Sequence, residues 1–301
     1  MELTRWPDVW IGAAVTLPGA REEATGGGDR ARSVLRPAGA AGPADVVLRA
    51  ARAARERPGA PAGALDLVVH AASGRDRARG GTAARVSHGL GCRGATAWEV
   101  WRPAGGGVLA LHLAARYVSG RPWTPLTALV TSEGGTDRPG TRGGRGAGPG
   151  ATGLLLSTTA GVARVLSTAV LDDQSHGALF RSDLAWRVPA ARTFPRTPAW
   201  VRDRGRRTAA GRQQGVDRRE GVDGLGPEEH EAVRLALAEC GRKMADVVRF
   251  ALPAAGGGTP SCDEMAVLVS LLDEEALRRG DIVVLAGGDR RGFGCAVLER
   301  C

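Results

Sequence analysis

The sequence predicts an α/β fold made of two similar halves. Short apolar runs bounded by Gly and Asp are typical of buried strands, and helix-like stretches separate them. This alternation indicates helices layered on sheets. In addition, three pairs of segments resemble one another in the same order along the chain, which indicates an internal duplication.

The first pair joins Asp66–Ser73 to Asp246–Pro253, and each of these segments follows a helix-like stretch. The other two pairs are Leu126–Ser132 with Asp281–Gly287, and Gly150–Leu156 with Gly292–Leu298. We therefore expect an N-terminal half over residues 1–160 and a C-terminal half over residues 161–301.

Two segments between these strands, Asp45–Arg57 and Pro227–Arg242, read as helices. Pro227 suits a first turn because the amide it lacks has no partner there. Glu228 and Glu229 place carboxylates at the positive end of the helix dipole.

The stretches Ser175–Gly226 and Glu133–Gly150 are rich in Gly and Arg and predict loops. Trp186 and Trp200 stand in the first as isolated apolar anchors. Both stretches read either as plain surface connections or as loops that contact a substrate or partner.

Bulk properties predict a folded cytoplasmic protein that does not span a membrane. A chain of 301 residues with 43% hydrophobic content can bury a large core. No apolar run approaches the about 20 residues that span a bilayer, and residues 1–7 lack the pattern of a signal peptide.

The net charge of +9 suits an acidic partner, such as an acyl carrier protein or a nucleic acid. Lys243 is the one lysine among 41 basic residues, and Arg, Ala and Gly are abundant together. That composition is typical of GC-rich coding, so we expect no nucleic-acid partner from the charge alone.

Metals and cofactors are not expected. The five cysteines form no CxxC pair, and Cys92, Cys240 and Cys295 read as small core residues. The Gly-rich segment 143–148 lacks both the strand-to-helix context and the Lys-Ser/Thr ending of a phosphate loop.

The stretch Trp98–Leu111, together with Leu65–Ser73 and Gly280–Gly288, resembles the ketoacyl-acyl-carrier-protein synthase III branch of the thiolase superfamily. The resemblance covers about Trp10 to Leu298 and is weakest between Gly161 and Gly226. It implies a five-layered αβαβα arrangement of two duplicated halves, and a dimer.

The catalytic groups of that family are missing. Ala104 stands where the family carries its nucleophilic Cys, and Ala254, after the matching Pro253, stands where it carries its His. The chain contains no Asn, and the counterpart of the family's Asn turn lies near Cys262, Asp263 and Glu264. An alanine methyl group can neither attack a thioester nor accept a proton.

Other residues could contribute to a remaining site. The amides of Gly105, Gly106 and Gly107 could bind an oxyanion, or these glycines could simply fill the emptied site with compact backbone. Ser73 and Ser132 end strands near the expected pocket. His70 and His112 read as interior histidines, His176 and His230 as exposed ones, and His88 as part of a variable helix.

The resemblance implies a ketosynthase III-like protein without condensing activity. We expect the silent subunit of a heterodimer with an active ketosynthase, in fatty-acid, polyketide or signal-molecule biosynthesis. Two alternatives stay open. One is an acyltransferase that acts on acyl-carrier-protein or coenzyme A thioesters without a covalent intermediate. The other is a homodimeric acyl-thioester-binding protein.

Overall fold

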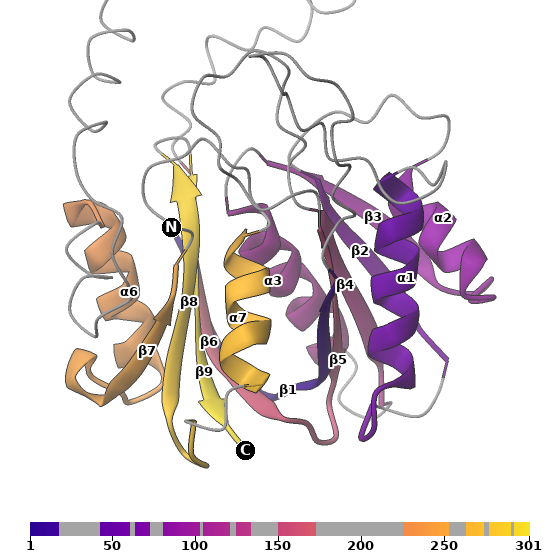
Figure 1. Ribbon diagram of the computed structural model, residues 1–301. Coiled ribbons are helices and arrows are strands. Elements are labelled where there is room, and N and C mark those ends of the chain that lie inside the picture. Colours follow the sequence, from indigo (N-terminus) through magenta and orange to yellow (C-terminus); the bar gives the residue numbers. More distant parts are fainter. Residues whose placement is uncertain are drawn as a thin grey trace, which may run out of the picture.

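The helices and strands form five layers (Figure 1). The computed structural model describes residues 1–17, 43–60, 64–72, 81–102, 105–120, 125–133, 150–172, 225–252, 263–273, 277–289 and 292–301. Helices α3 and α7 lie between two groups of strands, with α1 and α2 outside one group and α6 outside the other. This is the αβαβα arrangement expected from the sequence.

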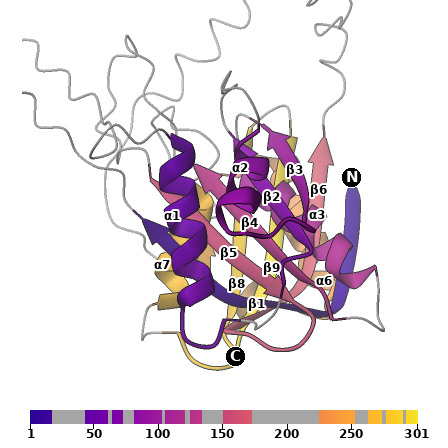
Figure 2. The ribbon, with the colours of Figure 1, turned by 90° about the vertical axis from the view of Figure 1, so that its right-hand side faces the viewer.

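The first half contributes five strands and three helices. Its elements are β1 (Glu2–Leu17), α1 (Pro43–Glu56), β2 (Leu67–Ala72), α2 (Thr82–Gly89), β3 (Thr96–Trp101), α3 (Gly106–Ser119), β4 (Thr127–Glu133) and β5 (Ala151–Ser157). Strand β2 runs parallel to both β3 and β4, whereas β5 pairs antiparallel with β4 and β1. Figure 2 shows α1 and α2 in front of these strands.

The second half repeats the pattern with one strand and one α-helix fewer among the described residues, since it has no counterpart of α2 and β3. Its elements are β6 (Ala163–Asp172), α6 (Pro227–Glu239), the short 3-10 helix η2 (Met244–Asp246), β7 (Val247–Ala251), α7 (Asp263–Asp273), β8 (Ile282–Asp289) and β9 (Gly292–Arg300). Strands β7 and β8 are parallel, and β9 is antiparallel to β8 and β6. The three segment pairs found in the sequence thus hold equivalent places.

One continuous sheet joins the two halves, in the order β3-β2-β4-β5-β1-β6-β9-β8-β7. Its centre is the 16-residue strand β1, which pairs with β5 from Trp10 onward and with β6 between Glu2 and Ile11. Both pairings shift register, and such irregularities bend a strand and let it pass from one layer to the other. The division of the chain at residues 160 and 161 stays a prediction.

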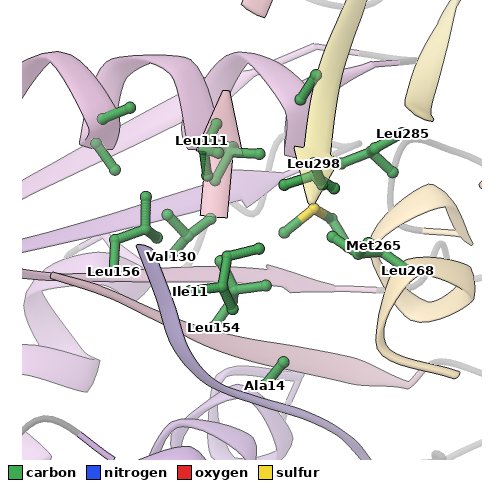
Figure 3. Close-up of a cluster of buried hydrophobic side chains, with 14 of the residues drawn as sticks. Ile11, Ala14, Leu111, Val130, Leu154, Leu156, Met265, Leu268, Leu285 and Leu298 are labelled. Carbon is green, nitrogen blue, oxygen red and sulfur yellow. The ribbon is translucent and has the colours of Figure 1, made fainter. Parts of the chain in front are cut away.

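The largest apolar cluster fills the central layer. Figure 3 shows Leu111 of α3 and Met265 and Leu268 of α7 among side chains from both groups of strands. Two further clusters pack α1 and α2 on the first half and α6 on the second. Burial on both faces explains why strands such as β5 read as continuous apolar runs in the sequence.

The two predicted helices are present as α1 and α6, and α6 ends three residues earlier than predicted, at Glu239. Pro227 occupies the first turn of α6, and Glu229 accepts a hydrogen bond from the Gly226 amide at 2.8 Å. None of the helices in the described ranges has the length and apolar character needed to cross a bilayer.

Candidate functional site

The sequence-predicted site residues fall into two groups. Ala104, Ala254 and Ser73 lie outside the described residues, as do Pro253 and Cys262. The predicted loops, apart from their end residues, also lie outside the described ranges, and so do the Gly-rich segment 143–148 and His176. Gly105, Gly106, Gly107 and Ser132 are described, and they allow one side of the expected site to be built.

The start of α3 is packed tightly against the end of β8. Gly105 precedes the helix with φ of +69°, a left-handed conformation that favours glycine. A Cβ atom on Gly105 would lie 2.5 Å from the carbonyl oxygen of Gly287, so the two backbones touch directly. Gly106 and Gly107 follow in the first turn and are buried.

Glu264 of α7 completes this junction. Its side chain is only 1% exposed, and Oε1 accepts a hydrogen bond from the Gly107 amide at 3.2 Å. The carboxylate therefore lies at the positive end of the α3 dipole, where an anion is stabilised. Of the three glycine amides predicted to bind an oxyanion, that of Gly107 thus already has an acceptor from the chain itself.

Ser132 is fully buried near the end of β4. Val130, two residues earlier on the strand, belongs to the central apolar cluster. Because side chains alternate along a strand, Ser132 lies on the same face as Val130. Among the described residues, its Oγ atom makes no hydrogen bond. A buried hydroxyl in this state is where a polar ligand group would gain an interaction.

His70 lies on the opposite face of the sheet. Its Nδ1 atom is 3.1 Å from Thr131 Oγ1, and its Nε2 atom is 3.9 Å from Glu133 Oε2. Val68 and Leu129, which share this face by alternation, pack in the outer cluster under α1 and α2. His70 is therefore an interior histidine, as predicted, and it does not face the start of α3.

His112 is also buried, within a network that links α3 to β1 and β6. Trp6 Nε1 donates to Thr168 Oγ1 at 2.9 Å, and the same oxygen is 2.8 Å from His112 Nδ1. His112 Nε2 lies 3.3 Å from Glu2 Oε1, and a carboxylate only accepts. These partners assign the proton to Nε2, with Nδ1 accepting from the Thr168 hydroxyl.

The charge state of His112 follows from its surroundings. Burial lowers the pKa of the His112 imidazole, the Glu2 carboxylate opposes this by raising it, and the Arg116 guanidinium lowers it further. The network is therefore built around a neutral ring that orients β1 on α3. The Thr168 hydroxyl is the one potential nucleophile beside the ring among the described residues, but it is fully buried and also accepts from Trp6, which suits a structural contact.

The remaining candidates within the described residues carry no catalytic arrangement. His88 and His230 are exposed, and Cys295 is fully buried, which raises the pKa of its thiol to about 12. Cys92 and Cys240, expected in the core, are only half-buried. Within the described ranges, no group of His, Cys, Asp and Glu side chains is arranged to hold a metal ion.

Comparison with known proteins shows which fold this is. No protein-family model matches the chain, and no curated protein matches it in sequence. Solved structures, in contrast, match the chain in fold. ChlB3, described as an "aceyltransferase", superposes with a TM-score of 0.71 at 21% identity over 98% of both chains.

Two ketosynthases superpose almost as well. The 3-oxoacyl-(acyl carrier protein) synthase III of Xanthomonas oryzae gives a TM-score of 0.67 at 16% identity, over 98% of this chain and 100% of that one. The priming β-ketosynthase of the R1128 polyketide pathway gives 0.66 at 15%, over 100% and 98%. The chain has the ketosynthase III fold.

In this ketosynthase III fold, Glu264 is the site residue that sequence reasoning missed. The sequence places it only near the counterpart of the missing Asn. The available signal was the acidic pair Asp263 and Glu264 at the start of the largely apolar run Met265–Leu272. Its partner Gly107 is 157 residues away, and no local pattern predicts such a contact.

Proposed function

We propose that the chain is a catalytically silent ketosynthase III-like subunit that pairs with an active ketosynthase in fatty-acid, polyketide or related secondary-metabolite biosynthesis. Its solved neighbours include two ketosynthases, which supports the pathway class. Alanine at positions 104 and 254, and the absence of Asn from the sequence, support silence. Strand β3 supports the pairing.

The observation that carries the pairing is an open sheet edge with two exposed tryptophans. Among the strands of the described residues, β3 is the last at this end of the sheet, and Trp98 and Trp101 on it are 39% and 48% exposed. An edge strand presents unpaired backbone groups, which a second strand can bind. Exposed tryptophans rarely gather on a free surface and are enriched at interfaces.

The two tryptophans lie on opposite faces of β3. Trp98 packs edge-on against Tyr117 of α3, with 5.7 Å between ring centroids. Trp101 Nε1 donates to Glu99 Oε2 at 3.1 Å, and Glu99 also accepts from the Ala83 amide of α2. A partner that continues the sheet would cover both rings, because its own helices flank the added strand on each face.

A ketosynthase of the same fold fits this edge because it offers an equivalent strand. Obligate interfaces of this kind bury more than about 2,000 Å² and are apolar. Such an interface keeps a subunit necessary after its own chemistry is lost. The positive net charge of the chain also supports an acyl carrier protein as a further, acidic partner of the pair.

The test is co-expression of the tagged chain with ketosynthases encoded beside its gene that keep the catalytic Cys. We expect a stable 1:1 complex by size-exclusion chromatography and native mass spectrometry. Trp98→Glu and Trp101→Glu together should abolish it, because two buried charges without partners cost on the order of several kcal/mol.

Ala238→Glu is the matched control, since it adds the same charge on the exposed side of α6, in the opposite outer layer. It should leave the complex intact. A homodimer that ignores every candidate ketosynthase would overturn the proposal and favour the homodimeric acyl-thioester-binding protein.

A second candidate is acyl transfer without a covalent intermediate, which the likeness to ChlB3, described as an "aceyltransferase", favours. It requires a base, and Glu264 is the acid that lies beside the start of α3. Turnover of an acyl thioester by the isolated chain, lost in Glu264→Gln, would establish this function. No turnover in either protein is expected for the silent subunit.

A further inference from the structure

Burial of the Glu264 carboxylate costs free energy, and its contacts with the start of α3 offset this cost. A carboxylate that is 1% exposed has lost nearly all of its hydration, which is costly unless it is paired or hydrogen-bonded. Its Oε1 atom lies 3.2 Å from the Gly107 amide at the start of α3. The helix dipole and the free amides of a first turn together favour an anion at this place.

Helix α3 has no anion of its own there. Its first turn contains no acidic residue, and the residue before it, Gly105, has no side chain with which to cap the helix. The capping group comes instead from α7, in the other half of the chain. Glu264 thus takes the part of a ligand for α3, although it belongs to the same molecule.

The Glu264 carboxylate is closely approached by backbone on two sides, at Gly107 and at Gly287. A Cβ atom on Gly107 would lie 3.1 Å from Glu264 Oε1 and 2.4 Å from Met265 Cγ. A Cβ atom on Gly287 would lie 3.1 Å from Glu264 Cδ. Glycines at positions 107 and 287 therefore make room for this side chain between the first turn of α3 and the end of β8.

We propose that Glu264 is an internal ligand. Its carboxylate occupies an anion site at the start of α3 and so keeps acyl oxyanions and small carboxylates out of it. The inference deepens the silence given under the proposed function, but it does not depend on the ketosynthase partner. Its direct consequence is that Glu264→Ala, which deletes the atoms of one acetate ion, opens a site for acetate.

The experiment compares thermal unfolding of Glu264→Ala and the unmodified chain in sodium acetate and in sodium chloride of equal ionic strength. A ligand that binds only the folded state raises its melting temperature. We expect acetate at about 100 mM to raise the Tm of Glu264→Ala by about 3 °C over chloride. The unmodified chain should show no difference, because its site is occupied.

Glu228→Ala is the matched control. Glu228 is also an acid in the first turn of a helix, but it is exposed and α6 is capped by its neighbour Glu229. Its removal should bring no acetate response. Equal melting temperatures of Glu264→Ala in acetate and chloride would overturn the proposal, and so would an equal acetate response in the unmodified chain.

If Glu264→Ala does not fold, Glu264→Asp tests the same contact. The shorter side chain withdraws the carboxylate from Gly107, so hydrogen exchange of the Gly107 amide should become at least tenfold faster. Unchanged exchange would overturn the proposal. Neither measurement involves a partner, so the two proposals can fail separately. No acetate response in Glu264→Ala, together with a stable heterodimer, would refute only the internal ligand. An acetate response without any heterodimer would refute only the pairing.

Discussion

At the scale of single residues, glycine has two separate uses in this chain. Gly91 and Gly105 both have positive φ, at +72° and +69°. A side chain on Gly91 would meet nothing within 4 Å, whereas one on Gly105 would strike the Gly287 carbonyl. Position 91 requires glycine only for its positive φ, whereas position 105 also requires the absence of a Cβ atom.

We therefore expect Gly91→Ala to cost about 1 kcal/mol of unfolding free energy, the penalty of the left-handed conformation alone. Gly105→Ala should cost about 3 kcal/mol or more, because the contact partner is backbone and cannot rotate away. Urea unfolding of both variants measures the difference. Equal losses would mean that α3 and β8 separate without cost.

The sequence correctly predicted the burial of single residues where their neighbours along the chain determine it. His70 and His112 stand among apolar neighbours, and both are buried as predicted. The sequence did not predict contacts such as those of Gly107 with Glu264 or of Trp6 with Thr168. They join residues 157 and 162 positions apart, and the fold alone brings them together.

At the scale of elements, most of the strands predicted from the sequence are buried on both faces, although β7, also predicted, is only partly buried, and the buried β6 was not predicted. Strands β2, β4, β8 and β9 are apolar runs between Gly and Asp, and the sequence pattern finds them. Strand β1 was not predicted, because Pro7 and several charged residues interrupt its pattern where its pairing with β6 shifts register. Helix α7 was also missed, since it follows a Gly-rich stretch.

Elements β1, α3 and β6 are joined by the network of Trp6, Thr168, His112 and Glu2, and this junction should respond to acid. Burial lowers the pKa of His112 below its usual value near 6.5, so the folded protein takes up this proton later than the unfolded chain. As the pH falls below about 6.5, the unfolded state is therefore favoured until the folded His112 also protonates.

We expect the unfolding free energy to fall between pH 7 and pH 5, with His112 contributing up to about 1.4 kcal/mol per pH unit. His112→Gln, whose amide can still donate to Glu2, should flatten this slope. Urea titrations at several pH values measure it, and exposed His88→Gln serves as the control. An unchanged slope in His112→Gln would assign the acid sensitivity to another group.

At the scale of the whole molecule, condensing chemistry requires groups from both halves at one place. The resemblance puts the Cys position at Ala104 in the first half, and the His and Asn positions at Ala254 and near Cys262 in the second. On this resemblance, the loss that we propose is distributed over both halves of the sequence. Replacing one group cannot repair it, since carbanion formation needs the other two.

Ala104→Cys alone should leave condensation at background. A thiol there could at most form an acyl-enzyme, with no imidazole or carboxamide to support the next step. Product formation from an acyl thioester and malonyl-acyl carrier protein, followed by mass spectrometry, is the measurement. Condensation by this single variant would show that other residues supply the missing groups.

The path of β1 has a consequence for how the protein is made. Strand β1 precedes the other described elements along the chain and pairs with β6, yet β6 is bordered on its other side by β9, where Ala163 meets Arg300. The middle of the sheet therefore cannot close until β9, which ends at Arg300, has left the ribosome. A nascent chain of this kind keeps apolar strand edges open throughout its synthesis, which gives chaperones a long period in which to bind it.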